Sequence, residues 1–104
     1  MAVNKDIAAQ LGRAWGNHRQ GNNEAAISEF RAILAEVRDN ADALYGLGLA
    51  QRAAGKTTDA AETFQRVLTI VLEALNNHPG EDRYEMLERM IKQRLGELDG
   101  GLVR

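Results

Sequence analysis

The sequence has no cysteine, a single proline (Pro79) and few aromatic residues, which make up 5% of its 104 positions. Without cysteine there is no disulfide framework and no thiolate chemistry, and a reducing compartment such as the cytoplasm is the expected location. With one proline, long segments are free to form helices, while the shortage of strand-favouring residues disfavours a sheet. These absences predict an all-helical fold.

An excess of charge of one sign is also missing. The chain carries 13 basic and 15 acidic residues, interspersed along its length, for a formal net charge of -2. Such a surface offers no basic field for nucleic acid and no uniform charge for a membrane. No apolar run reaches the roughly 18 residues of a membrane span, and the N-terminus lacks the apolar stretch of a signal peptide. We therefore expect neither a nucleic acid nor a membrane as partner.

Alanine and leucine are abundant, within a hydrophobic fraction of 44%. Both are strong helix formers, and 104 residues is close to the usual size of one domain. We expect a single domain that covers residues 1–104.

The chain repeats itself with a period of 34 residues. Residues 7–40 and 41–74 share seven identities, against roughly two expected by chance. Several identities fall at helical spacing, so one helical unit is predicted to occur twice. The identical pairs are Ala9/Ala43, Gly12/Gly46, Gly21/Gly55, Ala26/Ala60, Phe30/Phe64, Leu34/Leu68 and Val37/Val71.

Each copy of the repeat has the pattern of a helical hairpin. The turn clusters Gly21–Asn23 and Gly55–Asp59 end one periodic segment and cap the next. A connection this short forces the two helices of a copy to be antiparallel. The second helix of each copy has an apolar face, formed by Ala26, Ile27, Phe30, Ile33, Leu34 and Val37 in one and by Ala60, Ala61, Phe64, Val67, Leu68 and Val71 in the other.

The second copy continues into a longer helix, and a final helix follows. The apolar pattern reaches Leu75 before Asn76–Gly80 ends it. Asp82, with Glu85 three residues later, predicts a capped last helix that ends at Asp99. Two interpretations of the wide apolar face of the long helix stay open: a homodimer interface, or cover from both its own hairpin and the final helix. That face consists of Val67, Leu68, Ile70, Val71, Leu72, Ala74 and Leu75.

This spacing resembles the tetratricopeptide repeat, in which W-x2-L-G-x2-Y, A-x3-F and P recur every 34 residues. The residues that carry the resemblance are Leu44, Leu47, Gly48, Gly55, Ala60 and Phe64 in the second copy and Gly21, Ala26 and Phe30 in the first. The resemblance implies an all-α fold in which about five helices stack as a short superhelix. Repeat one would cover about 7–40, repeat two about 41–75, and a capping helix about 82–99.

The first helix fits the family pattern in two ways. With strict 34-residue spacing, Trp15 faces the open side, and apolar or aromatic positions are taken by Gln10, Arg13 and Asn17. With two extra residues in the turn, Trp15 is a core residue, and the four signature positions are taken by Ala8, Leu11, Gly12 and Trp15. Both alternatives stay open at this point.

In this family the first helices of the repeats line a concave surface that binds ligands. The resemblance places on it Asp42, Tyr45, Leu49 and Arg52 from the second copy, Glu85, Arg89 and Lys92 from the capping helix and, with strict spacing, Ala8, Leu11, Trp15 and His18. Tyr45, Leu49 and Trp15 can also be read as packing residues of a small domain. The lysine and asparagine pattern by which some members hold the C-terminal carboxylate of chaperones is missing, because its positions include Leu11, Trp15 and Gly46.

No residue pattern indicates an enzyme, a metal site or a cofactor site. Ala50–Thr57 satisfies a relaxed phosphate-loop pattern, but no strand is predicted before it, and the repeat turn explains Gly55. His18 and His78 have no second ligand at metal spacing, and Ser28, the only serine, has no histidine placed to activate it.

Two functions therefore stay open. The first is a non-enzymatic scaffold that binds a peptide or helix of another protein in the concave groove. The second is a structural element that forms homodimers through its long helix. The sequence does not identify the partner.

Overall fold

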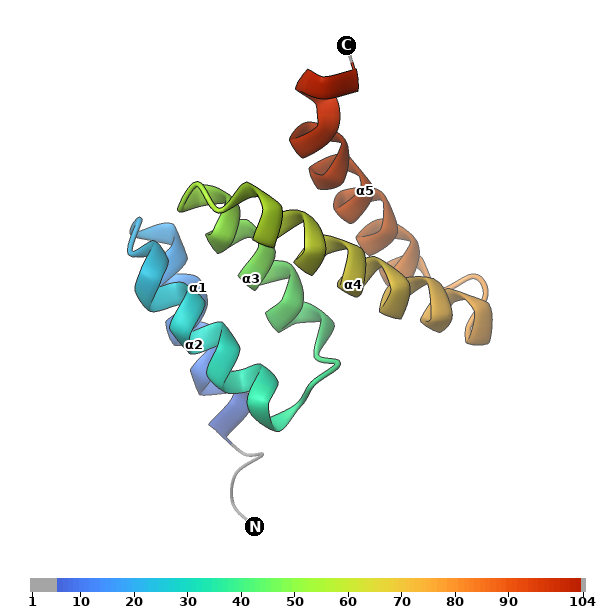
Figure 1. Ribbon diagram of the computed structural model, residues 1–104. Coiled ribbons are helices and arrows are strands. Elements are labelled where there is room, and N and C mark those ends of the chain that lie inside the picture. The colour runs from blue at the N-terminus through green and yellow to red at the C-terminus, as the bar shows by residue number, and fades with distance from the viewer. Residues whose placement is uncertain (1–5, 104) are drawn as a thin grey trace.

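The computed structural model describes residues 6–103, with side chains to residue 98, and this part of the chain contains five α-helices and no strand. Residues 1–5 and 104 of the predicted domain lie outside the described residues. The helices are α1 (Ile7–Arg19), α2 (Asn23–Glu36), α3 (Ala41–Ala53), α4 (Thr57–Asn77) and α5 (Asp82–Val103) (Figure 1). The predicted all-α fold is confirmed.

The first four helices follow the 34-residue period without an insertion. Helices α1 and α3 each have 13 residues, and α2 and α4 begin at equivalent positions, Asn23 and Thr57. Gly21 and Gly55 both have φ of +83°, the left-handed conformation that ends a helix most easily at glycine. The strict spacing is therefore correct, and the alternative with two extra residues in the turn is wrong.

Burial within α1 leads to the same register. Ala14, which stands 34 residues before Gly48, is fully buried. Gly12, which the rejected register places in the core, is exposed. A Cβ atom added to it would have no neighbouring atom within 4 Å. Strict spacing therefore puts a small residue where α1 packs closely, as the repeat requires.

Helix α4 is longer than its counterpart, with 21 residues against 14 in α2. The difference begins at Val37, which follows the last residue of α2, whereas its equivalent Val71 is still helical. In the first copy the next residues are Arg38–Asn40, which form a turn in which Asn40 caps α3 by accepting from the Ala43 N–H at 3.0 Å. In the second copy the helix-forming residues 72–74 replace them, so α4 continues for about two more turns.

Helix α5 differs from its prediction at both ends. Asp82 is its first helical residue and not its cap, since the N–H groups of Tyr84 and Glu85 bond to the carbonyl of Glu81. At the other end the helix continues to Val103, beyond the predicted end at Asp99. Glycine weakens a helix but keeps the N–H donor that proline lacks, so the two glycines at 100 and 101 do not end it.

The core consists of two hydrophobic clusters. One lies between α1, α2 and α3 around Phe30 and Ile33, and the other between α3, α4 and α5 around Phe64, Val71 and Ile91. The signature residues of the repeat are central to both: Ala26, Phe30, Ala60 and Phe64 are completely buried, and Leu47 is nearly so. These residues therefore lie inside the contacts between neighbouring helices.

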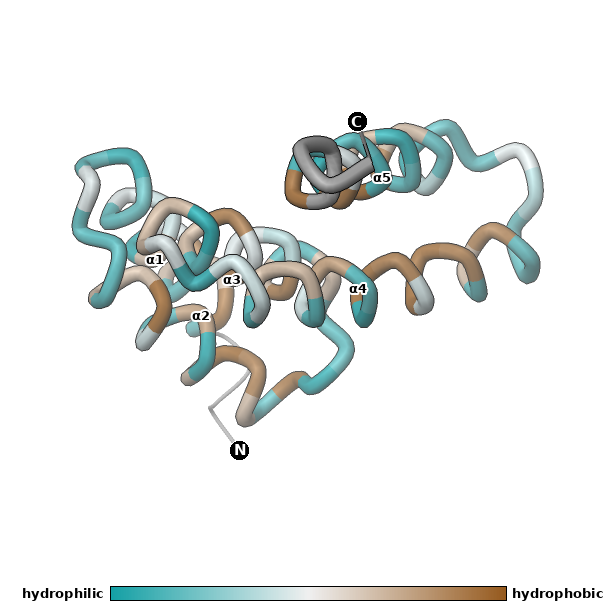
Figure 2. Tube along the Cα trace, turned by 45° about the horizontal axis from the view of Figure 1, so that its top comes forward, coloured by the Kyte–Doolittle hydropathy of each residue, from teal (hydrophilic) through white to brown (hydrophobic). Residues whose placement is uncertain are grey.

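The wide apolar face of α4 is largely covered. Figure 2 shows hydrophobic residues along the C-terminal half of α4, with α5 returning on one side of it. Val67 and Val71 are buried, and partly buried neighbours pack against the same cluster together with α5. Leu72 remains exposed, at 42%. Contacts with its own hairpin and with α5 thus cover most of this face of α4, in agreement with the second interpretation.

The segment that mimics a phosphate loop is the end of α3, the turn and the start of α4. Helix α3 precedes Gly55, where a phosphate loop would need a strand. The Lys56 ammonium lies 3.7 Å from the carboxylate of Glu24 on α2.

The described part of the chain contains no helix that combines the length and the hydrophobicity of a membrane span.

Candidate functional site: an apolar groove between the helices

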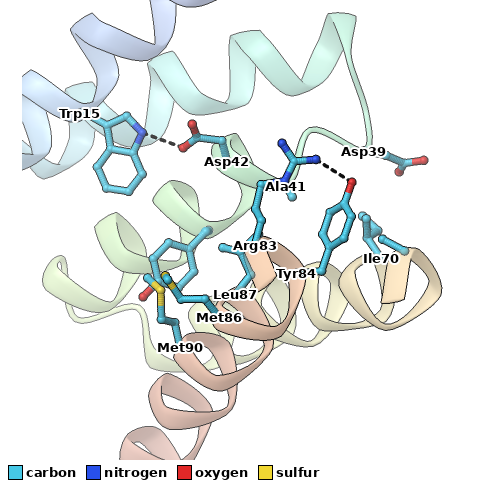
Figure 3. A pocket seen from close by; sticks show the side chains of 12 residues that line it. Trp15, Asp39, Ala41, Asp42, Ile70, Arg83, Tyr84, Met86, Leu87 and Met90 are labelled. Atoms are coloured by element: carbon cyan, nitrogen blue, oxygen red, sulfur yellow. Dashed lines mark hydrogen bonds between the residues drawn. The ribbon is translucent and has the colours of Figure 1, made fainter. Parts of the chain in front are cut away.

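A groove of about 800 Å³ opens between α3, the second half of α4 and the first half of α5, with Trp15 of α1 at one end (Figure 3). Ala74, which belongs to the additional turns of α4, forms part of its wall. The groove therefore depends on the extension of α4. Its lining residues are Trp15, Asp39, Ala41, Asp42, Tyr45, Ile70, Ala74, Arg83, Tyr84, Met86, Leu87 and Met90.

Trp15 belongs both to the groove and to the core. Its indole packs edge-on against Phe30, with ring centres 5.2 Å apart, and against His18 at 5.8 Å. Its Nε1–H donates to the Asp42 carboxylate at 2.9 Å, which joins α1 to α3 (Figure 3). Three contacts thus fix the ring while part of it lines the groove. The two interpretations of Trp15, core and open side, each hold for part of the ring.

Tyr45 is chiefly a packing residue. Only 6% of it is exposed, and its ring lies 5.8 Å from that of Phe64. Its hydroxyl accepts a hydrogen bond from Nε of Arg94 on α5 at 3.3 Å. This bond is the largest cause of the raised pKa of Arg94, and the bond to Glu97 is the second largest. Tyr45 therefore lines the groove with one edge and ties α3 to α5 with its hydroxyl.

The family comparison agrees with this repeat geometry. Residues 11–79 match the family model described as tetratricopeptide repeat. The chain belongs to the tetratricopeptide repeat family. Neither the curated proteins nor the solved structures give a match. Members of this family are typically non-enzymatic modules. The family membership gives this chain the general role of a scaffold for protein–protein interaction.

Two of the residues expected in the groove of this tetratricopeptide module serve other contacts. Arg52 pairs with Glu97 of α5 at 2.6 Å, and Arg94 pairs with the same carboxylate at 3.0 Å. The hydrogen bond from Arg94 is the largest cause of the lowered pKa of Glu97, and the charge of Arg52 adds to it. Leu49 packs against the second cluster. Neither Arg52 nor Leu49 lines the groove.

Three further expected residues also lie outside the groove lining. Leu11 packs against the first cluster, and Arg89 is exposed on α5. His18 is partly buried, and its Nδ1 has no hydrogen-bond partner among the described residues. Burial, and then the charges of Arg52 and Arg19, lower its pKa. Ala8, Glu85 and Lys92 are also absent from the lining. Of the eleven residues expected on the concave surface, the structure brings only Trp15, Asp42 and Tyr45 to the groove.

The α5 residues that line the groove differ from those predicted for the concave surface, which are Glu85, Arg89 and Lys92. Tyr84, Met86, Leu87 and Met90 belong to the α5 part of the lining. The two methionines lie one turn apart and line the groove, and Met86 is 53% exposed. The i, i+4 spacing of the two methionines, beside the apolar face of the helix, is the sequence signal that could have indicated them as groove residues.

Arg83 also lies in this wall, held by Tyr84. Its guanidinium carbon is 4.7 Å from the centre of the tyrosine ring, and its Nη2 donates to the tyrosine hydroxyl at 2.8 Å. In Figure 3 the polar groups of Asp42, Arg83 and Tyr84 lie toward one edge of the groove and the methionines toward the other.

The described residues contain no cluster of three or more potential metal ligands.

Proposed function

We propose that this tetratricopeptide module binds an apolar segment of a partner protein in the groove between α3, α4 and α5. The observation that carries the proposal is an exposed methionine, Met86, on the wall of a groove that is mostly apolar and already formed. A volume of about 800 Å³ is within the range of sites that enclose ligands of defined shape. Methionine side chains adapt to different apolar surfaces, which suits a protein-binding groove.

A helix is the form of partner segment that suits this wall. The α5 residues of the wall run from Arg83 to Met90, a length of about 10 Å at 1.5 Å per residue. A ligand helix would present side chains one turn apart to such a wall, in the manner of amphipathic helices that dock in hydrophobic grooves. Trp15, fixed by three contacts, supplies a rigid aromatic end for it.

The test starts with peptides of about 16 residues, long enough for four helical turns, selected from a random library on the immobilised chain. A selected peptide is then titrated against Met86→Glu and Leu72→Glu. Both residues are exposed, at 53% and 42%, but only Met86 lines the groove. Met86→Glu should weaken binding by about 1–3 kcal/mol, while Leu72→Glu leaves it unchanged. Circular dichroism should show both variants folded.

Self-association through α4 is the second candidate, and the exposure of Leu72 favours it. The long helix is the interaction surface if light scattering shows a homodimer that Leu72→Glu dissociates and if Met86→Glu leaves the peptide affinity unchanged. That result would replace the groove proposal.

A further inference from the structure

We infer that Met86 is a modification site, at which oxidation of the thioether by a peroxide makes the groove wall polar and releases the partner segment. The inference rests on the proposed function, because it names a regulation of the same groove. Three features of the molecule support it: the exposure of Met86, its separation from the core, and the engagement of the hydrogen-bond donors that line the groove.

Met86 is the described methionine that a dissolved oxidant reaches more easily. The sequence has three methionines, of which Met1 lies outside the described residues. Met86 is 53% exposed, whereas Met90, one turn further along α5, is partly buried. The sequence contains no cysteine, whose thiolate would compete for a peroxide. Of the two described methionines, Met86 is therefore expected to react first.

The reaction transfers one oxygen atom and two electrons. The sulfur of Met86 attacks one oxygen of hydrogen peroxide, the O–O bond breaks and an S–O bond forms. The sulfur is oxidised by two electrons to the sulfoxide, and the departing hydroxide takes the proton of the transferred oxygen and leaves as water. Methionine sulfoxide reductases reverse the oxidation, so the modification can act as a switch.

Oxidation at Met86 changes the groove without changing the core. Met90 lines the groove and also packs against the second hydrophobic cluster. Met86 lines the groove but is not among the described side chains that pack against either cluster. A sulfoxide at Met90 would disturb helix packing, whereas one at Met86 leaves the packing intact. The modification of Met86 therefore acts on binding and not on folding.

A sulfoxide in this wall opposes the docking of an apolar segment. Its oxygen accepts hydrogen bonds, which water supplies while the groove is open and which a covering apolar segment removes. Two strong donors of the lining are already in use. Arg83 donates to the Tyr84 hydroxyl at 2.8 Å. The indole N–H of Trp15 donates to Asp42 at 2.9 Å. In Figure 3 the polar groups of Arg83 and Asp42 also lie toward the edge opposite the methionines.

The test oxidises the full chain with a limited amount of hydrogen peroxide, removes the oxidant and locates the sulfoxides by peptide mapping with mass spectrometry. The probe is a peptide selected on the untreated chain that itself lacks methionine, cysteine and tryptophan. Sulfoxide should form faster at Met86 than at Met90. Protein oxidised at Met86 should bind the probe roughly tenfold more weakly with unchanged circular dichroism, and methionine sulfoxide reductases should restore the affinity.

Two variants locate the effect. Met86→Leu and Met90→Leu each remove one sulfur and keep an apolar side chain of similar size. Each variant is compared with itself before and after peroxide, so a change in its starting affinity does not enter. Peroxide should change the affinity of Met86→Leu by less than about twofold and weaken that of Met90→Leu by roughly tenfold. An equal loss in both variants would overturn the inference, as would faster oxidation of Met90.

The inference and the proposed function fail in different ways. If Met86→Glu weakens binding of the probe but the sulfoxide at Met86 does not, the groove proposal stands and the inference about oxidation falls. If Met86→Glu leaves the affinity unchanged, both fall.

Discussion

At the scale of single residues, Phe30 and Phe64 set how closely the helices approach. A Cβ built on Gly46 would overlap the ring of Phe30, and one built on Gly48 would lie 2.6 Å from Cε1 of Phe64. Each ring therefore needs a glycine on α3 directly opposite. The phenylalanines and Gly48 belong to the repeat signature, while Gly46 does not.

This contact predicts opposite effects at two equivalent positions. Gly46→Ala should destabilise by about 1–3 kcal/mol, because the added methyl group displaces the buried ring of Phe30. Gly12→Ala, 34 residues earlier and without a neighbour within 4 Å, should stabilise by up to about 1 kcal/mol through helix propensity. Urea denaturation of both variants checks this, and equal shifts would contradict the described packing.

His18 gives a prediction about pH. Its pKa in the folded protein is lowered from the usual 6.5, chiefly by burial. Below pH 6.5 the unfolded chain therefore binds more protons at this site than the folded one. The stability contributed by neutral His18 is complete above that pH and is lost as the pH falls toward the lowered pKa.

The urea midpoint of the wild type should accordingly fall between about pH 7.5 and about pH 5.5 by more than that of His18→Gln. His78→Gln is the control for the substitution itself, because His78 is exposed. Identical pH dependence in wild type and His18→Gln would contradict the burial of this ring.

At the scale of helices, the repeat period was enough to predict the first four elements and their turns. The 34-residue identities encode the same local turn twice, at Gly21 and Gly55. The groove was harder to predict, because its α5 wall depends on how far α4 extends and at what angle α5 returns. The repeat period gives neither quantity, so it does not place Met86 and Met90 in the groove. Arg52, which was expected on the concave surface, pairs with Glu97 outside the groove lining.

Helix α5 is predicted to be an integral part of the fold. Ile91 is completely buried in the second cluster, so Ile91→Ala should destabilise by about 2–5 kcal/mol. Met86→Ala, on the same helix but 53% exposed, should stay within about 0.5 kcal/mol of the wild type. Chemical denaturation measures both. A small effect at Ile91 would mean that α5 does not dock on α4 in solution.

At the scale of the whole molecule, the helices form a thin assembly. Its extents are 46 × 34 × 19 Å, and the smallest is about two helix diameters. In such a layer each helix contacts mainly its neighbours in sequence, and stability builds up along the chain as in other repeat proteins. Two features join the parts: Trp15 and Leu34 pack against both clusters, and Arg94 links α5 to Tyr45 on α3.

These links predict a single unfolding transition for all five helices. Far-ultraviolet circular dichroism follows the total helix content, and the fluorescence of Trp15, the only tryptophan, follows the contact between the two clusters. The two signals should give coincident urea curves. Ile91→Ala should shift both curves equally, although it lies on α5 and the fluorophore lies on α1. If circular dichroism shows helix loss before the fluorescence changes, and Ile91→Ala moves only that early phase, then α5 and the groove wall open separately from the repeats.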